Sequence, residues 1–297
     1  MNRGAMMAHD LRRVVWLGNG NTDTEGLKDT LTRELRERDV RVEMSPDAAF
    51  DSEADVVITA CADDDELRAL LLGTDGVLNA VHAGLLLVDI SPVSEPLSRE
   101  IDAAAQRANV AYLRAPLTLG PGQAGERVYT AMVSGPREAR QRAEVLLHAL
   151  AGKVIYLGDG DEARAMTRVL DVMTGVSMAM WAEALVFGEA VGLDWREMLD
   201  VMQTSAIGSP VIQSHTPQVA QRDFHSLPGC KQMTERLGAA LAHGKATGTV
   251  LMLTGQAHQM YLGAMHHGLA QQGLTAIVPW LETAAGVRPD STQPATR

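Results

Sequence analysis

The sequence predicts a doubly wound, mainly parallel α/β domain followed by an all-α domain, with one long helix joining the two. Short apolar runs alternate with helical stretches up to Gly160, and this order is typical of a parallel sheet with right-handed crossovers. From Glu162 to about Val191 nearly every residue favours a helix, and the sequence beyond is helical as well. A chain of 297 residues is long enough for two such domains.

Apolar segments that are short enough to be strands define the α/β domain. Continuous apolar runs such as residues 55–60 are typical of strands that are covered on both faces. The predicted strands are residues 14–17, 40–44, 55–60, 84–89, 110–114, 128–133 and 154–157. Helical stretches lie between them at residues 24–38, 94–107 and 136–151. We therefore place an α/β domain at residues 12–161.

The long helix and the sequence after it predict the second domain, residues 162–287. The stretch has no proline and only two glycines, Gly175 and Gly188, and about 30 residues of helix make a rod of about 45 Å. A rod of that length with apolar residues on several faces needs a partner for its outer half. We expect a homodimer in which the subunits share their long helices. The polar tail, residues 288–297, is expected to be disordered.

Composition excludes several classes of partner. Asp and Glu exceed Lys and Arg by 37 to 26, a formal charge of -11, which disfavours nucleic acid and anionic membranes. The first residues lack the apolar run of a signal peptide, and no run reaches the roughly 20 apolar residues that span a bilayer. Neither the two cysteines, Cys61 and Cys230, nor the histidines have the spacing of a metal site. We expect a cytoplasmic protein that acts on a small molecule, without metal, nucleic acid or membrane.

A G-x-G turn follows the first predicted strand. Gly18 and Gly20 provide the tight turn and the bare backbone that a pyrophosphate needs. The third small residue of a dinucleotide fingerprint is replaced by Asp23, a carboxylate at the helix N-terminus that should face the phosphates. The alternative is an ordinary turn with Asp23 or Thr24 as N-cap. The predicted nucleotide contacts here are Gly18, Asn19, Gly20 and Asn21.

Several further blocks resemble the β-hydroxyacid dehydrogenase family, which includes 3-hydroxyisobutyrate dehydrogenases and the divergent imine reductases. Val88-Asp-Ile-Ser-Pro-Val-Ser-Glu-Pro96 resembles its D-x-S-T-x-x-P segment, and Arg114-Ala-Pro-Leu-Thr-Leu-Gly120 resembles its D-A-P-V-S-G-G substrate loop. Other matching blocks are Val56–Thr59, Gly125-Glu126, Met132-Val133, Ser177-Met178, Ala182–Leu185 and Gly192–Asp194. The resemblance covers roughly residues 12–285 and implies a Rossmann-like domain with an all-α partner domain.

The resemblance also implies which residues meet cofactor and substrate. Thr59 and Ala60 correspond to the segment along the cofactor ribose, and Ser45 is the only side chain placed to touch a 2′-phosphate. The residues matching substrate-contacting positions are Ser91, Thr118, Leu119 and Gly120. The cofactor implied is NADP or NAD.

The family's catalytic lysine lies on the long helix, one turn before an asparagine. Here Thr167 takes the lysine position and Asp171 the asparagine position. Threonine does not donate a proton at neutral pH, whereas Asp171 can act as an acid if a dry pocket raises its pKa. Imine reductases also lack the lysine and often have Asp or Tyr on this helix. In the alternative interpretation Asp171 is a solvated or ion-paired helix residue, with Arg164 or Arg168 as partner.

Acidic residues stand at several positions near the expected cofactor. Besides Asp23, the family's Lys-Asp-Leu segment is replaced by Glu235-Arg236-Leu237, and residues 63–65 are all aspartates. Each uncompensated carboxylate near a phosphate costs on the order of 1 kcal/mol. Two functions are therefore open. The first is an NAD(P)-dependent oxidoreductase that transfers hydride in the interdomain cleft, with a C=N substrate slightly favoured over a 3-hydroxy acid. The second is a family member that has lost cofactor binding and uses the cleft for non-redox chemistry or ligand binding.

Overall fold

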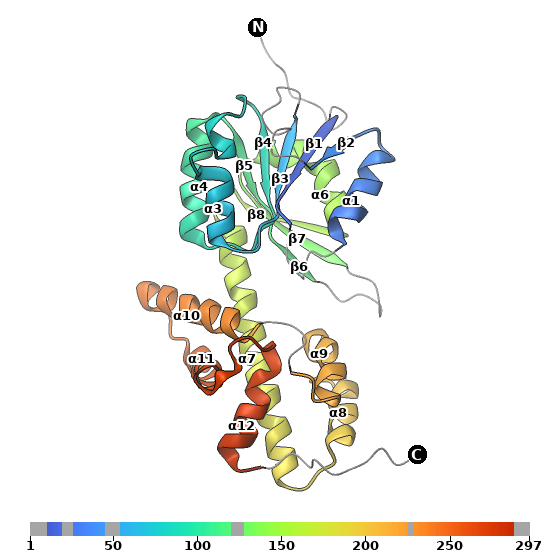
Figure 1. Cartoon of the computed structure of the whole chain (residues 1–297), viewed down its shortest axis with the longest axis vertical. Coiled ribbons are helices and arrows are strands. Elements are labelled where there is room, and N and C mark those ends of the chain that lie inside the picture. Colours follow the sequence, from blue (N-terminus) through green and yellow to red (C-terminus); the bar gives the residue numbers. More distant parts are fainter. Residues whose placement is uncertain (1–10, 20–25, 45–53, 120–127, 225–228, 288–297) are drawn as a thin grey trace. The chain divides into compact units, whose positions relative to one another are not determined.

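The protein is described from a computed structural model, which covers residues 11–19, 26–44, 54–119, 128–224 and 229–287. The chain divides into two compact units, Met1–Thr167 and Arg168–Arg297. Helix α7 (Glu162–Ala190) contains the point of division (Figure 1). The predicted domain boundary between residues 161 and 162 coincides with the start of this helix.

The first unit is built on one eight-stranded sheet of order β2-β1-β3-β4-β5-β7-β6, with β8 paired to β7. The strands are β1 (Arg13–Leu17), β2 (Arg41–Glu43), β3 (Val56–Thr59), β4 (Leu86–Asp89), β5 (Ala111–Arg114), β6 (Leu117–Leu119), β7 (Tyr129–Ser134) and β8 (Lys153–Gly158). The first five are parallel, whereas β7 is antiparallel to β5 and β6. The doubly wound sheet is thus confirmed. Only β6 was not predicted, because its three residues lie within the segment interpreted as a substrate loop.

Helices cover both faces of the sheet. Helices α1 (Leu27–Arg36) and α6 (Glu144–Leu150) pack on one face, and α3 (Asp64–Leu72) and α4 (Glu95–Arg107) pack on the other (Figure 1). Val14 and Trp16 of β1 belong to the first core, and Val15 and Leu17 to the second. This division follows from strand geometry, because successive side chains point to opposite faces.

Two predicted helices begin or end differently from expectation. The stretch 136–151 forms two helices, α5 (Arg137–Arg142) and α6, which are separated at Ala143. Helix α1 begins at Leu27 after Gly26, whose φ of 75° is left-handed. Gly26 therefore stands at the N-cap position of α1, and Asp23 and Thr24, the predicted caps, lie outside the described residues. By contrast, Ser94 caps α4 by accepting a hydrogen bond from the Leu97 backbone.

The second unit is helical throughout the residues that the structure describes. Its core joins Met178, Trp181 and Leu185 of α7 to Tyr261 and Ile277 of later helices. After α7 these are α8 (Trp195–Thr204), α9 (Pro210–Ala220), α10 (Cys230–Thr247), α11 (Met252–Ala264) and α12 (Ile277–Ala285), with short turns η3 (Met265–Leu269) and η4 (Leu274–Ala276); the first unit has one such turn, η2 (Val77–Asn79). The predicted all-α region and its long helix are confirmed.

Helix α7 is buried on one face and exposed and apolar on the other. Among the described residues it is the one helix long and apolar enough to cross a membrane, with 29 residues and an 18-residue stretch of mean hydropathy 1.4. Met178, Ala182 and Leu185 nevertheless lie in the helical core, and the core helix of a globular domain meets the same criteria. Its exposed large apolar residues are Val169, Met173, Met180 and Phe187, and the exposed Val191 follows directly after its last residue. At 3.6 residues per turn these five lie within about 40° of one another around the helix axis, and we call them the α7 stripe.

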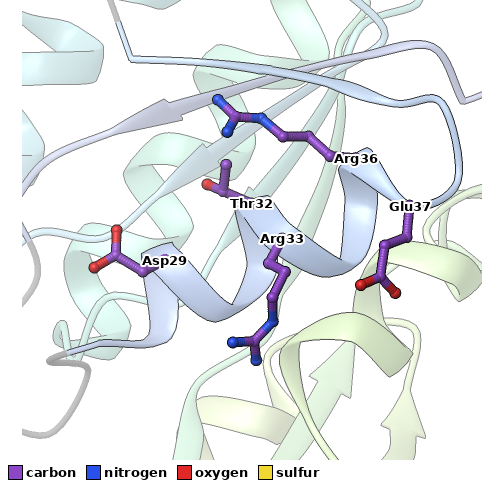
Figure 2. A pocket seen from close by; sticks show the side chains of 5 residues that line it. All are labelled: Asp29, Thr32, Arg33, Arg36 and Glu37. Atoms are coloured by element: carbon purple, nitrogen blue, oxygen red, sulfur yellow. The ribbon is translucent and has the colours of Figure 1, made fainter.

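A hollow of about 470 Å³ lies along α1 and is lined by Asp29, Thr32, Arg33, Arg36 and Glu37 (Figure 2). The lining side chains carry two positive and two negative charges, so the hollow has no net preference for an anion or a cation. Because α1 returns from the carboxyl end of β1 toward the start of β2, its last turn lies at the amino edge of the sheet. The hollow itself follows the length of α1, from Asp29 in its first turn to Glu37 at its end.

One guanidinium joins three helices of the second unit. Arg222 donates to Oε1 of Glu282 on α12 and to Oε1 of Glu189 on α7, both at 2.7 Å. Its Cζ also lies 4.2 Å from the centre of the Trp195 ring on α8. Burial, with a smaller effect of the nearby Glu189, raises the pKa of Glu282 to about 7 against the opposing effect of Arg222. Glu282 therefore holds a proton in the folded state at a pH where the unfolded chain has released it.

This shift predicts that the second unit becomes less stable as the pH rises. The contribution of Glu282 is complete below about 4.5, where both states are protonated, and is lost as the pH rises to about 7. Glu282→Gln keeps an acceptor for Arg222 and removes the titrating proton, so its free energy of unfolding should change less between pH 5 and pH 8. Urea unfolding at both pH values measures the difference, with Glu183→Gln on the exposed side of α7 as control. Equal pH dependence in Glu282→Gln and the unsubstituted chain would contradict the assignment.

Candidate functional site

The turns after β1, β3 and β4 lie together at the carboxyl edge of the sheet. Strand β1 pairs with β2 on one side and with β3 on the other, so the connections that leave β1 and β3 cross to opposite faces. Ligands of open α/β sheets bind at such a switch point, beyond the carboxyl ends of the strands. Backbone bonds from Ala60 to Leu17 and from Ile90 to Thr59, both 2.9 Å, hold the three turns side by side.

Gly18 is the residue of the G-x-G turn that the structure places, together with the exposed Asn19. Its φ is +90°, and a Cβ there would lie 2.3 Å from the Ala60 carbonyl oxygen. The Trp16 indole also donates to the Gly18 carbonyl at 3.0 Å. Only glycine fits between these neighbours, so the bare backbone predicted for this turn is a requirement of the fold as well as of a pyrophosphate.

Thr59 and Ala60 lie at this edge, but the Thr59 side chain is committed elsewhere. Both residues are buried, and Thr59 Oγ1 donates to Asp89 Oδ1 at 2.9 Å. Any contact between this segment and a cofactor must therefore use the backbone. Cofactor contact by either residue stays a prediction.

Ser91 is held at the same edge, directly after β4. It is 1% exposed, and its Oγ accepts a hydrogen bond from the Cys61 backbone at 2.9 Å. Its own backbone N–H donates to Asp89 Oδ1 at 3.0 Å. Burial raises the pKa of the neighbouring Cys61 thiol to about 12, so Cys61 is no nucleophile at neutral pH. Ser91 is the predicted substrate residue whose side chain the structure orients most completely.

Thr118 and Leu119 lie on β6, next to β7 at the other end of the sheet order. Thr118 pairs with Thr130, and Leu119 is 51% exposed. The two residues are accessible on a strand, where the sequence predicted a loop. No hydrogen bond among the described contacts joins them to Ser91.

Thr167 and Asp171 occupy successive turns of α7 and have different roles in it. Thr167 Oγ1 donates to the Ala163 carbonyl at 3.1 Å, an ordinary helix contact. Asp171 Oδ1 accepts from Arg236 Nη1 on α10 at 3.3 Å. Burial raises the pKa of Asp171, while Arg236 and Arg168 oppose the shift. The net direction is the one that an acid needs.

Asp171 forms an ion pair, as its alternative interpretation expected, but Arg164 is not the partner. The pair is made with Arg236, and the Arg168 charge also acts on the carboxylate. Arg164 instead pairs with Asp89 at 2.5 Å. Arg236 belongs to the Glu235-Arg236-Leu237 segment that departs from the family pattern, so two departures from that pattern contact each other.

The acidic residues near the expected cofactor mostly have local partners. Asp63 caps α3 by accepting from the Glu66 backbone at 2.9 Å. Asp64 accepts from the Ser94 backbone at 2.8 Å and from the Ser94 hydroxyl. Glu235 is exposed and lies 3.8 Å from Lys231 one turn earlier. These contacts weaken the electrostatic argument against a bound phosphate, because capped and paired carboxylates are partly compensated.

Some of the predicted residues lie outside the described parts of the chain: Gly20, Asn21, Asp23, Ser45, Gly120 and the tail 288–297. The described residues include no group of three His, Cys, Asp or Glu side chains placed to hold a metal ion.

Sequence reasoning missed a buried charged network beneath the site. Asp89 is fully buried, and Arg114 and Arg164 are each 2% exposed. Burial raises the pKa of Tyr112 far above its usual range, so its hydroxyl stays protonated and donates to Asp89 Oδ2 at 3.0 Å. The sequence did contain one indication of this network, because the apolar strands β4 and β5 each end in a charged residue, Asp89 and Arg114. A buried charge at such a position requires a partner.

Comparisons with known proteins place this geometry among dehydrogenases. The family model described as the NAD binding domain of 6-phosphogluconate dehydrogenase matches residues 20–158. The model described as NAD-binding of NADP-dependent 3-hydroxyisobutyrate dehydrogenase matches residues 158–281. The two matches adjoin where α7 is about to begin.

Individual proteins agree with the family models. A probable mitochondrial 3-hydroxyisobutyrate dehydrogenase of Dictyostelium discoideum is 25% identical and covers 94% of this chain and 88% of its own. The crystal structure of a 3-hydroxyisobutyrate dehydrogenase from Salmonella typhimurium has a TM-score of 0.78 at 22% identity, over 90% of this chain and 99% of that one. An imine reductase variant from Myxococcus stipitatus, solved with NAD+, has a TM-score of 0.53 at 18% identity, over 91% of this chain and 99% of that one. At such identities the two structures show the shared fold.

The short distance between Gly18 and the Ala60 carbonyl predicts that a side chain at position 18 destabilises the fold by more than backbone strain alone. Gly18→Ala should cost more than the 1–3 kcal/mol or so of a left-handed non-glycine residue, because its Cβ also meets a backbone oxygen. Gly84 is the matched control, since its φ is +91° and a Cβ there has nothing within 4 Å. Thermal unfolding of Gly18→Ala and Gly84→Ala measures both effects. Equal melting temperatures would show that the Ala60 carbonyl moves aside freely.

Proposed function

The chain belongs to the β-hydroxyacid dehydrogenase family, and we propose that it is an NAD(P)-dependent oxidoreductase acting on a small C=N or C=O substrate. The observation that carries the proposal is the Gly18 turn at the switch point of the sheet, where side-chain-free backbone is available to a pyrophosphate. The alternative of a member without cofactor binding has no support, because NAD-binding models cover nearly the whole chain.

The turn fits a dinucleotide by its chemistry. Gly18 presents bare backbone, and Asn19 beside it is exposed, so neither residue blocks a phosphate. When bound, the nicotinamide supplies or accepts the hydride. Titration with NADPH and with NADH, followed by nicotinamide fluorescence, tests binding and decides between the two nucleotides. Absence of saturable binding at millimolar concentration of either would end the proposal.

Asp171 is proposed to supply or orient the proton. Its position on α7 corresponds to the family's asparagine, one turn after a lysine that this chain replaces with Thr167. Burial favours its protonated form, and a carboxylate also stabilises an iminium by charge. Both properties favour a C=N substrate, and oxidation of a 3-hydroxy acid such as 3-hydroxyisobutyrate is the alternative. Ser91, Thr118 and Leu119, with Gly120, are proposed to hold the substrate.

We further propose a homodimer in the cytoplasm. The α7 stripe gives the dimer a surface, because its spacing of four and seven residues is that of helices packed along an apolar seam. Both cysteines are buried and free of disulfides, as expected in a reducing compartment.

Replacing Asp171 with asparagine tests the proton role. Asp171→Asn keeps the shape and removes the acid, so kcat should fall by roughly 100-fold or more while KM changes little. In the reductive direction, kcat of the unsubstituted enzyme should fall as the pH rises through the raised pKa of Asp171. The pH profile of Asp171→Asn should not show this fall. Reduction of a cyclic imine and oxidation of 3-hydroxyisobutyrate are the assays, with Glu183→Gln on the same helix as control. Near-normal turnover in Asp171→Asn, with loss in Ser91→Ala, would assign the proton to water or substrate.

The homodimer is tested by light scattering at micromolar concentration. The unsubstituted chain should have about twice the 31.9 kDa monomer mass. Phe187→Glu places a charge in the α7 stripe, where the side chain is 69% exposed, and should yield monomer. Val201→Glu on α8 is equally exposed, at 67%, and should remain dimeric. A monomeric unsubstituted chain would refute the dimer, and a dimeric Phe187→Glu would move the interface away from the stripe.

A further inference from the structure

Two buried arginines fasten the start of α7 to the carboxyl edge of the sheet. Arg164, in the first turn of α7, donates from Nη2 to Asp89 Oδ2 at 2.5 Å. Arg114, the last residue of β5, donates from Nε to Asp161 Oδ1 at 2.9 Å, just before the helix begins. We call these four residues, Asp89, Arg114, Asp161 and Arg164, the arginine clamp. Arg164 extends from the helix to the sheet, and Arg114 extends from the sheet to the residue before the helix.

The carboxylate of Asp89 is fully used within the clamp. Oδ1 accepts from Thr59 Oγ1 at 2.9 Å and from the Ser91 backbone at 3.0 Å. Oδ2 accepts from Tyr112 at 3.0 Å and from Arg164 at 2.5 Å. Four bonds match the acceptor capacity of an ionised carboxylate. Of the four donors only Arg164 carries a charge, so it alone compensates the buried negative charge.

Arg164 also binds Ser91 directly. Its Nη1 donates to the Ser91 carbonyl at 2.5 Å. Ser91 is thereby held at three points: its N–H by Asp89, its carbonyl by Arg164, and its Oγ by the Cys61 backbone. The Ser91 hydroxyl also interacts with the Cys61 thiol and lowers the pKa of that thiol against the effect of burial. A substrate oxygen or nitrogen would take this O–H in place of the weakly accepting thiol.

We propose that Arg164 is a positioning residue, which fixes the Ser91 hydroxyl in the orientation that binds substrate. The proposal rests on the assignment of Ser91 to substrate under the proposed function. A guanidinium is a planar fork that binds a carboxylate and a carbonyl at once, whereas an ammonium on a flexible stem does not replace it. Arg164→Lys therefore keeps the charge and loses the simultaneous hold on Asp89 and on Ser91.

Arg114 provides a matched control inside the same clamp. Its burial equals that of Arg164, and it binds Ser98 and Asp161 at 2.9 Å and Asp102 at 3.2 Å. No described contact joins it to Ser91. Arg114→Lys therefore loosens a buried arginine at the start of α7 without touching the Ser91 carbonyl.

Cys61 reports the state of the Ser91 turn without any substrate. Its backbone N–H is the donor to Ser91 Oγ, and the residue is 1% exposed. Labelling with a disulfide reagent should be slow in the unsubstituted chain and at least about tenfold faster at Cys61 in Arg164→Lys. Cys230, buried in the helical unit, is the internal reference and should keep its rate. Arg114→Lys should leave Cys61 labelling within about twofold of the unsubstituted rate.

Kinetics with 3-hydroxyisobutyrate and a cyclic imine then test the link to substrate. Arg164→Lys should raise KM about tenfold or more with kcat within about twofold, and leave the Kd of the nucleotide unchanged. In Ser91→Ala, adding Arg164→Lys should have little further effect, since the hydroxyl it positions is gone. A merely structural role predicts additive losses and a lower melting temperature in Arg164→Lys and Arg114→Lys alike.

Each outcome decides the proposal. The proposal is overturned if Cys61 in Arg164→Lys is labelled as slowly as in the unsubstituted chain. It is also overturned if the effects of Arg164→Lys and Ser91→Ala on KM are additive. Should Arg164→Lys not fold, the paired variant Asp89→Asn with Arg164→Gln replaces it, because it leaves neither charge buried alone and the glutamine amide still donates to the Ser91 carbonyl. Partial protection of Cys61 is then expected, and full protection overturns the proposal. A chain that binds neither NADPH nor NADH refutes the proposed function instead, and Cys61 labelling still shows whether Arg164 holds the Ser91 turn.

Discussion

The fully buried carboxylate of Asp89 requires a compensating charge, and Arg164 supplies it from the first turn of α7. Around this one ion pair the structure aligns β3 through Thr59, β4 through the Ser91 backbone and β5 through Tyr112. Removing one partner of such a pair typically costs about 3–5 kcal/mol, because the other charge stays buried. The turn that carries Ser91 therefore takes its shape from a charged contact beneath it.

A second consequence concerns the chemistry of α7. The family pattern has a lysine and an asparagine on this helix, whereas this chain has Thr167 and Asp171 and pairs Asp171 with Arg236 of α10. The positive charge beside this position is thus supplied from a different helix, by the guanidinium of Arg236. Arg236 opposes the effect of burial on Asp171, so the acid strength of that carboxyl reflects a balance between desolvation and one ion pair.

Much of the fold was predictable, because apolar periodicity reports burial directly. The runs at residues 55–60 and 84–89 gave strands in the centre of the sheet, and the unbroken helix formers after Glu162 gave α7. β6 was not predicted because three residues are too few to show the alternation of a strand. The break between α5 and α6 at Ala143 was not predicted because the residues on both sides of it favour a helix. The site was less predictable. Gly18 was found from its turn chemistry, but the pairing of Arg164 with Asp89 joins residues 75 positions apart, and no local pattern encodes such a contact.

The arginine clamp also constrains how this sequence can diverge. Asp89 has no acceptor position left, and Arg164 is its only charged donor, so neither residue can change first without leaving a buried charge alone. Arg114 stands where the family motif has an aspartate, and here Asp161 supplies the opposite charge. Drift between the two arrangements therefore requires paired substitutions at distant positions. Related chains should carry these residues as linked sets, with Asp89 and Arg164 inherited together and the identity of residue 161 following that of residue 114.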